Sequence, residues 1–131
     1  MSDTEKPNIL IVDDNPANLI AMRILLKVLD VNIIKASSGK EALAYLPQYN
    51  FAAILMDVRM PEMDGYETAE HIHQNEEFKN IPIIFVTAID EDEQEKYKFN
   101  ENVVVEYIYK PLDPDILIKR VNVIIQPRKR S

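Results

Sequence analysis

At 131 residues with 47% hydrophobic content, the chain is typical of one globular domain, and its net charge of −7 disfavours direct binding to nucleic acid. The absence of cysteine excludes disulfide and thiolate chemistry, and no apolar run reaches the roughly 18 residues of a membrane span. We therefore expect a single cytoplasmic domain over residues 1–131, with a core of about 8–126 and a charged tail or linker start at 127–131, that binds neither membrane nor nucleic acid directly.

The chain is predicted to contain five strands. Most are short apolar runs with little polar alternation, a pattern typical of strands that are buried on both faces of a sheet. In chain order, the predicted strands cover residues 8–12, 31–36, 51–56, 83–86 and 103–109.

Five helices are predicted to follow these strands in alternation, from helical spacing of apolar side chains or from acidic first turns. The first and last begin with a capping side chain followed by proline, in the pairs Asn15-Pro16 and Asp113-Pro114. Pro47 is expected to end the second helix, and Gly65, which opens the third, can take a positive φ. The predicted helices cover residues 16–30, 41–46, 65–72, 90–99 and 114–124.

This alternation of strands and helices defines the fold class. Strands separated by helices and short connections form a parallel sheet with helices on both faces, joined by right-handed crossovers. The chain is therefore predicted to be an α/β protein, while the alternation alone leaves the order of the strands open.

Chemically useful side chains follow four of the predicted strands. They lie at one edge of the sheet, where open α/β sheets bind ligands, provided that these strands are neighbours. Taken alone, each has a plain structural explanation, such as helix-start chemistry for the first acidic pair, but their joint placement favours a functional site. The residues are Asp13 and Asp14 after the first strand, Asp57 after the third, Thr87 at the fourth and Lys110 after the fifth.

This set of side chains suits a divalent cation and a phosphoryl group. Crowded carboxylates raise one another's pKa, and a cation removes that cost. Mg²⁺ prefers oxygen ligands and is commonly held by one or two carboxylates together with phosphate oxygens. An ammonium and a hydroxyl would stabilise a phosphoryl group, and an aspartate can attack phosphorus to form an acyl phosphate.

The motifs around these residues are similar to those of the receiver domains of two-component response regulators. The resemblance covers most of the chain, from about residue 8 to 126, and implies a flavodoxin-like doubly wound sheet with strand order 2-1-3-4-5 and five helices. The matching segments are ILIVDDNPAN, ILMDVRMPEMDG, IIFVTA and YIYKPLDPD.

The resemblance also implies which residues receive the phosphoryl group and hold Mg²⁺. Asp57 resembles the phosphoacceptor. Asp14 and Asp57 resemble direct metal ligands, together with the backbone carbonyl of Arg59, and Asp13 resembles a ligand that acts through water.

Three further residues match positions that respond to phosphorylation in this family. Lys110 resembles the lysine that pairs with Asp57 and then with the phosphoryl group, and its bond to Pro111 is expected to be cis. Thr87 resembles the switch hydroxyl, and Tyr107 resembles the switch aromatic that turns inward when the hydroxyl moves.

By resemblance, the chain is expected to be a phosphorylation-controlled switch and not an enzyme in its own right. The implied phosphodonor is a sensor histidine kinase or a histidine phosphotransfer protein. The face formed by the fourth helix, fifth strand and fifth helix would signal to a downstream protein or output domain, and a homodimer through that face is a further option.

Three other functions share part of this pattern. Aspartyl-nucleophile phosphatases also use Mg²⁺, but they usually carry a second acid two residues after the nucleophile, where this chain has Arg59. A flavin-binding module would need a loop of small hydroxyl residues after the first strand, whereas residues 13–16 are acidic and repel anions. A docking domain that is not phosphorylated is the third alternative.

Overall fold

Five parallel strands form one sheet in the order β2-β1-β3-β4-β5, in a computed structural model that describes residues 6–88 and 105–126. This order confirms the doubly wound arrangement and makes neighbours of the four strands that carry candidate site residues. The strands are β1 (Asn8–Val12), β2 (Asn32–Ala36), β3 (Phe51–Met56), β4 (Ile83–Thr87) and β5 (Val105–Tyr109).

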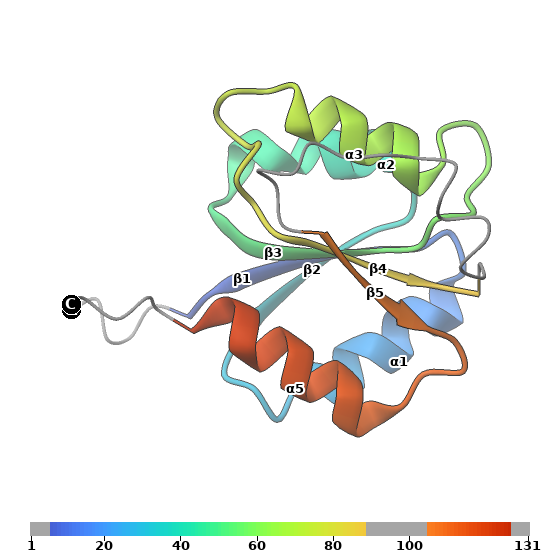
Figure 1. Cartoon of the computed structure of the whole chain (residues 1–131), viewed down its shortest axis with the longest axis vertical. Coiled ribbons are helices and arrows are strands. Elements are labelled where there is room, and N and C mark those ends of the chain that lie inside the picture. Colours follow the sequence, from blue (N-terminus) through green and yellow to red (C-terminus); the bar gives the residue numbers. More distant parts are fainter. Residues whose placement is uncertain (1–5, 89–104, 127–131) are drawn as a thin grey trace.

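The sheet lies between two layers of helices, with α2 and α3 on one face and α1 and α5 on the other (Figure 1). Two hydrophobic clusters fill the space between the sheet and these layers. The inner strands β1, β3 and β4 are almost wholly buried, because helices cover both of their faces. The helices are α1 (Pro16–Leu26), α2 (Gly39–Tyr45), α3 (Gly65–His73) and α5 (Pro114–Ile125), with a 3-10 turn, η2 (Leu46–Gln48).

The predicted helix starts are confirmed at both ends of the chain. The side chain of Asn15 accepts a hydrogen bond from the backbone N–H of Ala17 at 2.9 Å, directly before the proline that opens α1. Asp113 accepts a hydrogen bond from the backbone N–H of Asp115 at 2.9 Å in the same position of α5. Each cap satisfies a backbone donor that has no partner within its helix.

Two predicted helix boundaries are wrong. The first helix ends at Leu26, not near residue 30, because the chain turns there while Leu29 still packs against the core. The second helix ends at Tyr45, and Pro47 lies inside the 3-10 turn that continues it. The predicted helix over residues 90–99, residues 103–104 of the predicted fifth strand and the tail at 127–131 lie outside the described residues.

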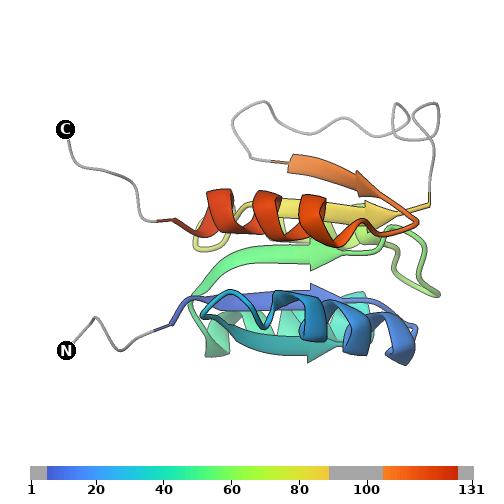
Figure 2. The ribbon, with the colours of Figure 1, turned by 90° about the horizontal axis from the view of Figure 1, so that it is seen from below.

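All five strands point in the same direction, so their carboxyl ends lie together along one edge of the sheet (Figure 2). The loops that leave this edge lead into α1, α2, α3 and α5. The candidate site residues at the ends of β1, β3, β4 and β5 therefore lie along this single edge.

Candidate functional site

Asp57 follows directly after β3 and is only 8% exposed. Its backbone N–H donates to the carbonyl oxygen of Val12 at 2.9 Å, which joins the end of β3 to the end of β1. Its carboxylate oxygen Oδ1 accepts a hydrogen bond from the backbone N–H of Arg59 at 3.3 Å. The backbone thus holds this carboxylate where two buried strands end.

The loop from Asp57 into α3 is held close to the phosphoacceptor candidate. The N–H of Gly65 donates to the carbonyl oxygen of Val58 at 2.7 Å, and a Cβ at Gly65 would overlap the backbone carbonyl of Asp57. Glycine is needed here for close approach and does not use the positive φ that is open to it. The left-handed residue of this loop is Glu62, with φ of 69°.

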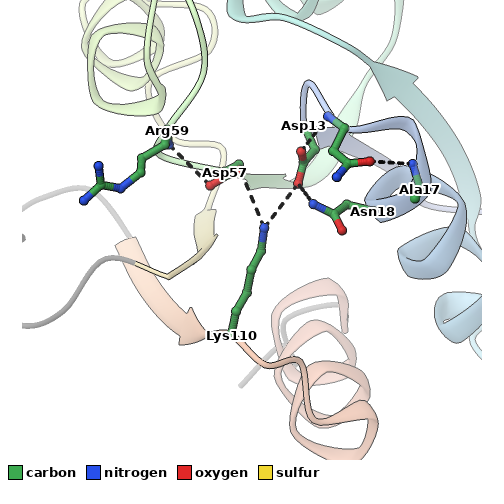
Figure 3. A network of polar contacts seen from close by, with 7 residues as sticks. Asp13, Ala17, Asn18, Asp57, Arg59 and Lys110 are labelled. Carbon is green, nitrogen blue, oxygen red and sulfur yellow. Dashed lines mark hydrogen bonds and ion pairs between the residues drawn. The ribbon is translucent and has the colours of Figure 1, made fainter.

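Lys110 lies between two carboxylates at the centre of the site (Figure 3). Its Nζ is 3.6 Å from Oδ2 of Asp57 and 3.6 Å from Oδ2 of Asp13. The sequence suggested only the pairing with Asp57, so the equal contact with Asp13 is new. The bond between Lys110 and Pro111 is cis, as expected, and the backbone N–H of Lys110 donates to the carbonyl oxygen of Thr87 at 2.9 Å.

Three carboxylates converge beside this lysine. One oxygen from each of Asp13, Asp14 and Asp57 lies within 4.8 Å of the others. Asp13 is buried, whereas Asp14 is exposed to solvent. A set of oxygen donors at this spacing, open to solvent on one side, fits a hard divalent cation such as Mg²⁺ that retains some of its water.

The charge of this cluster is only partly compensated. Burial raises the pKa of the Asp57 carboxyl above its ordinary value, and the negative charge of Asp13 acts in the same direction. The Lys110 ammonium and the N–H of Arg59 oppose this rise. An added positive charge would therefore favour the ionised form of Asp57.

The carboxylate of Asp13 accepts hydrogen bonds from two residues that were not predicted to contact it. Its Oδ1 accepts a hydrogen bond from the backbone N–H of Asn15 at 2.9 Å, and its Oδ2 accepts one from Nδ2 of Asn18 at 3.1 Å. Both donors belong to the start of α1, so the helix cap and the site share residues (Figure 3). Asn18 lies at the end of the matching segment ILIVDDNPAN, but its contact with Asp13 was not predicted.

Thr87 and Tyr107 occupy different surroundings. Thr87 is fully buried at the end of β4. Tyr107 pairs in register with Phe85 of β4, and its hydroxyl lies 2.9 Å from the hydroxyl of Tyr66 in α3. Burial, followed by the hydrogen bond with Tyr66, raises the pKa of Tyr107. The pairing of Tyr66 with Tyr107 was not predicted from the sequence.

Arg59 contributes its backbone to the site. Its side chain is exposed, and it points away from Asp57 (Figure 3). The backbone N–H faces the carboxylate of Asp57, as described above. Of the residues singled out in the sequence, Asp13, Asp14, Asp57 and Lys110 therefore form one cluster, with the backbone of Arg59 at its border.

Comparisons with known proteins agree with this geometry. Residues 9–122 match the family described as response regulator receiver domain. The chain is 40% identical over its full length to a Vibrio cholerae protein named a probable cyclic di-GMP phosphodiesterase, of which it spans 29%. It is 30% identical to PilH of Pseudomonas aeruginosa over 89% of this chain and 96% of that protein. The solved structure of the Vibrio cholerae chemotaxis protein CheY4 has a TM-score of 0.82 at 25% identity, covering 92% of this chain and 99% of that chain.

The chain belongs to the response regulator receiver domain family. Receiver domains are signalling modules of two-component systems, in which they work with histidine kinases and output domains. The chain spans less than a third of the Vibrio cholerae relative that is named a probable cyclic di-GMP phosphodiesterase. Within residues 6–88 and 105–126, no helix is long and apolar enough to cross a membrane.

Proposed function

We propose that this chain accepts a phosphoryl group on Asp57 from a phosphohistidine of a sensor histidine kinase or histidine phosphotransfer protein. The observation that carries the proposal is the position of Asp57, which is buried at a strand end between a backbone donor and the ammonium of Lys110. The family assignment supports it, because receiver domains work with histidine kinases.

The transfer requires Asp57 to act as a nucleophile. A carboxylate oxygen of Asp57 attacks phosphorus, the P–N bond to the donor imidazole breaks, and an acyl phosphate forms. Lys110 lies within reach of Asp57 Oδ2, so its positive charge favours the ionised nucleophile and would then face the new phosphoryl oxygens. The backbone N–H of Arg59 limits the rotation of the carboxylate during attack.

Mg²⁺ is the cofactor that this site would hold. Asp14 and Asp57 would be direct ligands with the backbone carbonyl of Arg59, while Asp13 would bind through water. Bound Mg²⁺ would neutralise charge on the transferring phosphoryl group. The hydrogen bonds that already occupy both oxygens of Asp13 support an indirect role for it.

The signal would leave the site through the residues that the resemblance names. The new dianion would draw in the hydroxyl of Thr87, and Tyr107 would move into the space vacated beside it. The face that includes β5, α5 and the predicted helix over residues 90–99 would then change partners, either a downstream protein, an output domain or a second copy of the chain. We place this receiver unit, over residues 1–131, in the cytoplasm.

The proposal is tested by mass spectrometry after incubation with Mg²⁺ and acetyl phosphate. We expect one added phosphoryl group on the wild-type chain and none on Asp57→Asn. Asp30→Asn, which changes a highly exposed aspartate paired with Lys6, is the matched control and should be modified normally. Modification that survives Asp57→Asn, or its absence in the wild type, would refute the assignment.

A further inference from the structure

We propose that Asn18 is a positioning residue that holds the Asp13 carboxylate in place for Mg²⁺, an inference that rests on the proposed function. Asn18 is the third residue of α1, and its side chain turns back toward the carboxyl edge of the sheet (Figure 3). Its Nδ2 donates to Oδ2 of Asp13 at 3.1 Å. Asn18 is the last residue of the segment ILIVDDNPAN, and the resemblance implied no role for its side chain.

The need for such a donor follows from the burial of Asp13. This residue is 1% exposed, so its carboxylate has to be satisfied by protein groups. Oδ1 has the backbone N–H of Asn15 at 2.9 Å. Oδ2 has Asn18 and also Lys110, whose Nζ lies at a longer 3.6 Å and is shared with Asp57.

Asn18 allows Lys110 to serve both carboxylates. The side chain of Lys110 is 27% exposed, and its Nζ forms ion pairs of the same length with Asp13 and Asp57. If Asn18 were lost, Oδ2 of Asp13 would depend on Lys110 alone, which would pull the ammonium toward Asp13 or let the carboxylate rotate. Rotation of the carboxylate would displace an oxygen of the three-carboxylate cluster, and movement of the ammonium would weaken its contact with Asp57.

The hydrogen bond from Asn18 to Asp13 is not part of the cap of α1. The side chain of Asn15 caps α1 by accepting from Ala17, and the contact of Asn15 with Asp13 uses only its backbone N–H. The two asparagines therefore have separable roles. Removing the Asn15 side chain weakens the helix start and leaves a donor to Asp13, whereas removing the Asn18 amide deletes a donor to Asp13.

The test compares Mg²⁺ affinity between two variants of α1. Asn18→Leu keeps the approximate side-chain size without the donor, and a neighbouring cavity of about 240 Å³ that Asn18 lines can accept it. We expect its Mg²⁺ dissociation constant, measured by calorimetry, to rise about tenfold, as for other residues that orient metal ligands. Ile24→Ala, which changes an exposed side chain in the second half of α1, is the control and should leave the Mg²⁺ dissociation constant within twofold of the wild-type value.

The outcomes separate this inference from the proposed function. An unchanged Mg²⁺ dissociation constant in Asn18→Leu, while the wild type binds Mg²⁺ and is phosphorylated, would overturn the role of Asn18 alone. A wild type that neither binds Mg²⁺ nor accepts a phosphoryl group would overturn the proposed function. Equal weakening in Ile24→Ala would show a general effect of α1 and would also overturn the inference. Asn18→Ala repeats the comparison if leucine prevents folding.

Discussion

The two edges of the sheet satisfy their polar groups in different ways. At the amino edge, where the first three strands begin, neutral amides pair with one another. Nδ2 of Asn32 donates to Oδ1 of Asn8 at 3.1 Å, and Nδ2 of Asn8 donates to the carbonyl oxygen of Asn50 at 3.1 Å. These bonds join three neighbouring chain segments without placing a charge in the protein.

At the carboxyl edge, ionisable side chains gather and their charges do not balance. Lys110 faces the buried carboxylates of both Asp13 and Asp57, and the third carboxylate of the cluster, Asp14, adds a further negative charge. Burial raises the pKa of Asp57, which means that its charge opposes folding. The contrast shows where a ligand can act: a cation or phosphoryl group changes the energy of the carboxyl edge. The described residues of the amino edge instead carry paired amides and the exposed ion pair of Lys6 with Asp30.

The largest expected effect is at the loop that supports Asp57. Gly65→Ala should destabilise the protein by about 3 kcal/mol, because the new Cβ would overlap the backbone carbonyl of Asp57, which cannot move without breaking the end of β3. Urea denaturation measures this loss as a shift of the midpoint at a constant slope.

Gly39→Ala is the matched control for this substitution. Its Cβ would meet the side chain of Thr68 at the contact between α2 and α3, and we expect a smaller loss of about 1–2 kcal/mol because a side chain can rotate. A loss in Gly65→Ala no greater than that in Gly39→Ala would contradict the idea that the loop is held by backbone contact.

The next effect concerns the unbalanced charge itself. Without Mg²⁺ at pH 7, Asp57→Asn should stabilise the protein by about 1 kcal/mol, because it removes a desolvated negative charge and leaves Lys110 with Asp13. Since the pKa of Asp57 in the folded protein lies above its ordinary value of 3.8, its stabilising protonated form is fully present below that value and is lost as pH rises through the folded pKa.

The pH dependence gives this prediction its sharpest form. The stability advantage of Asp57→Asn should be small at pH values below 3.8 and grow with rising pH until the carboxyl of the folded protein is ionised. Chemical denaturation at a series of pH values measures it. An advantage that stays constant with pH, or that has the opposite sign, would show that the charge of Asp57 does not oppose folding.

Much of the fold and the backbone frame of the site could be predicted, because both depend on local patterns. Short apolar runs mark buried strands, and a parallel sheet brings the residues that follow its strands to one edge. Asp13, Asp57 and Lys110 were found in this way, and the structure places them in contact. The end of α1 was misplaced because Leu29 continues the apolar pattern from a turn.

The side-chain partners of the site could not be predicted for a physical reason. The contact of Asn18 with Asp13 depends on how far α1 is rotated about its axis, and the contact of Tyr66 with Tyr107 depends on how α3 packs over β4 and β5. Both are set by the packing of whole elements, which no local pattern encodes. The strand order likewise came from the resemblance to receiver domains and not from the alternation of elements.

A smaller effect is expected for the hydrogen bond between the two tyrosine hydroxyls that links α3 with β5. A double-mutant cycle of Tyr66→Phe and Tyr107→Phe should give a coupling free energy of about 1 kcal/mol, because each single change breaks the same 2.9 Å hydrogen bond between partly buried groups. Urea denaturation of the four proteins measures it. The control is Tyr49→Phe at an exposed ring, whose effect on the free energy of unfolding should be additive with either change. Additive effects of Tyr66→Phe and Tyr107→Phe would show that the hydrogen bond between them contributes nothing to stability.

The smallest effect should be at the amino edge, and it completes the comparison between the edges. Asn32→Ala removes the donor to Oδ1 of Asn8 at an exposed position, so we expect a loss of only about 0.5 kcal/mol. Because no charge is involved, this loss should be the same across the pH series used for Asp57→Asn, and Mg²⁺ should not change it. A loss that varied with pH or Mg²⁺ would mean that the two edges are coupled through β1. The hydrogen bonds of the amino edge would then not contribute to stability independently of the charged site.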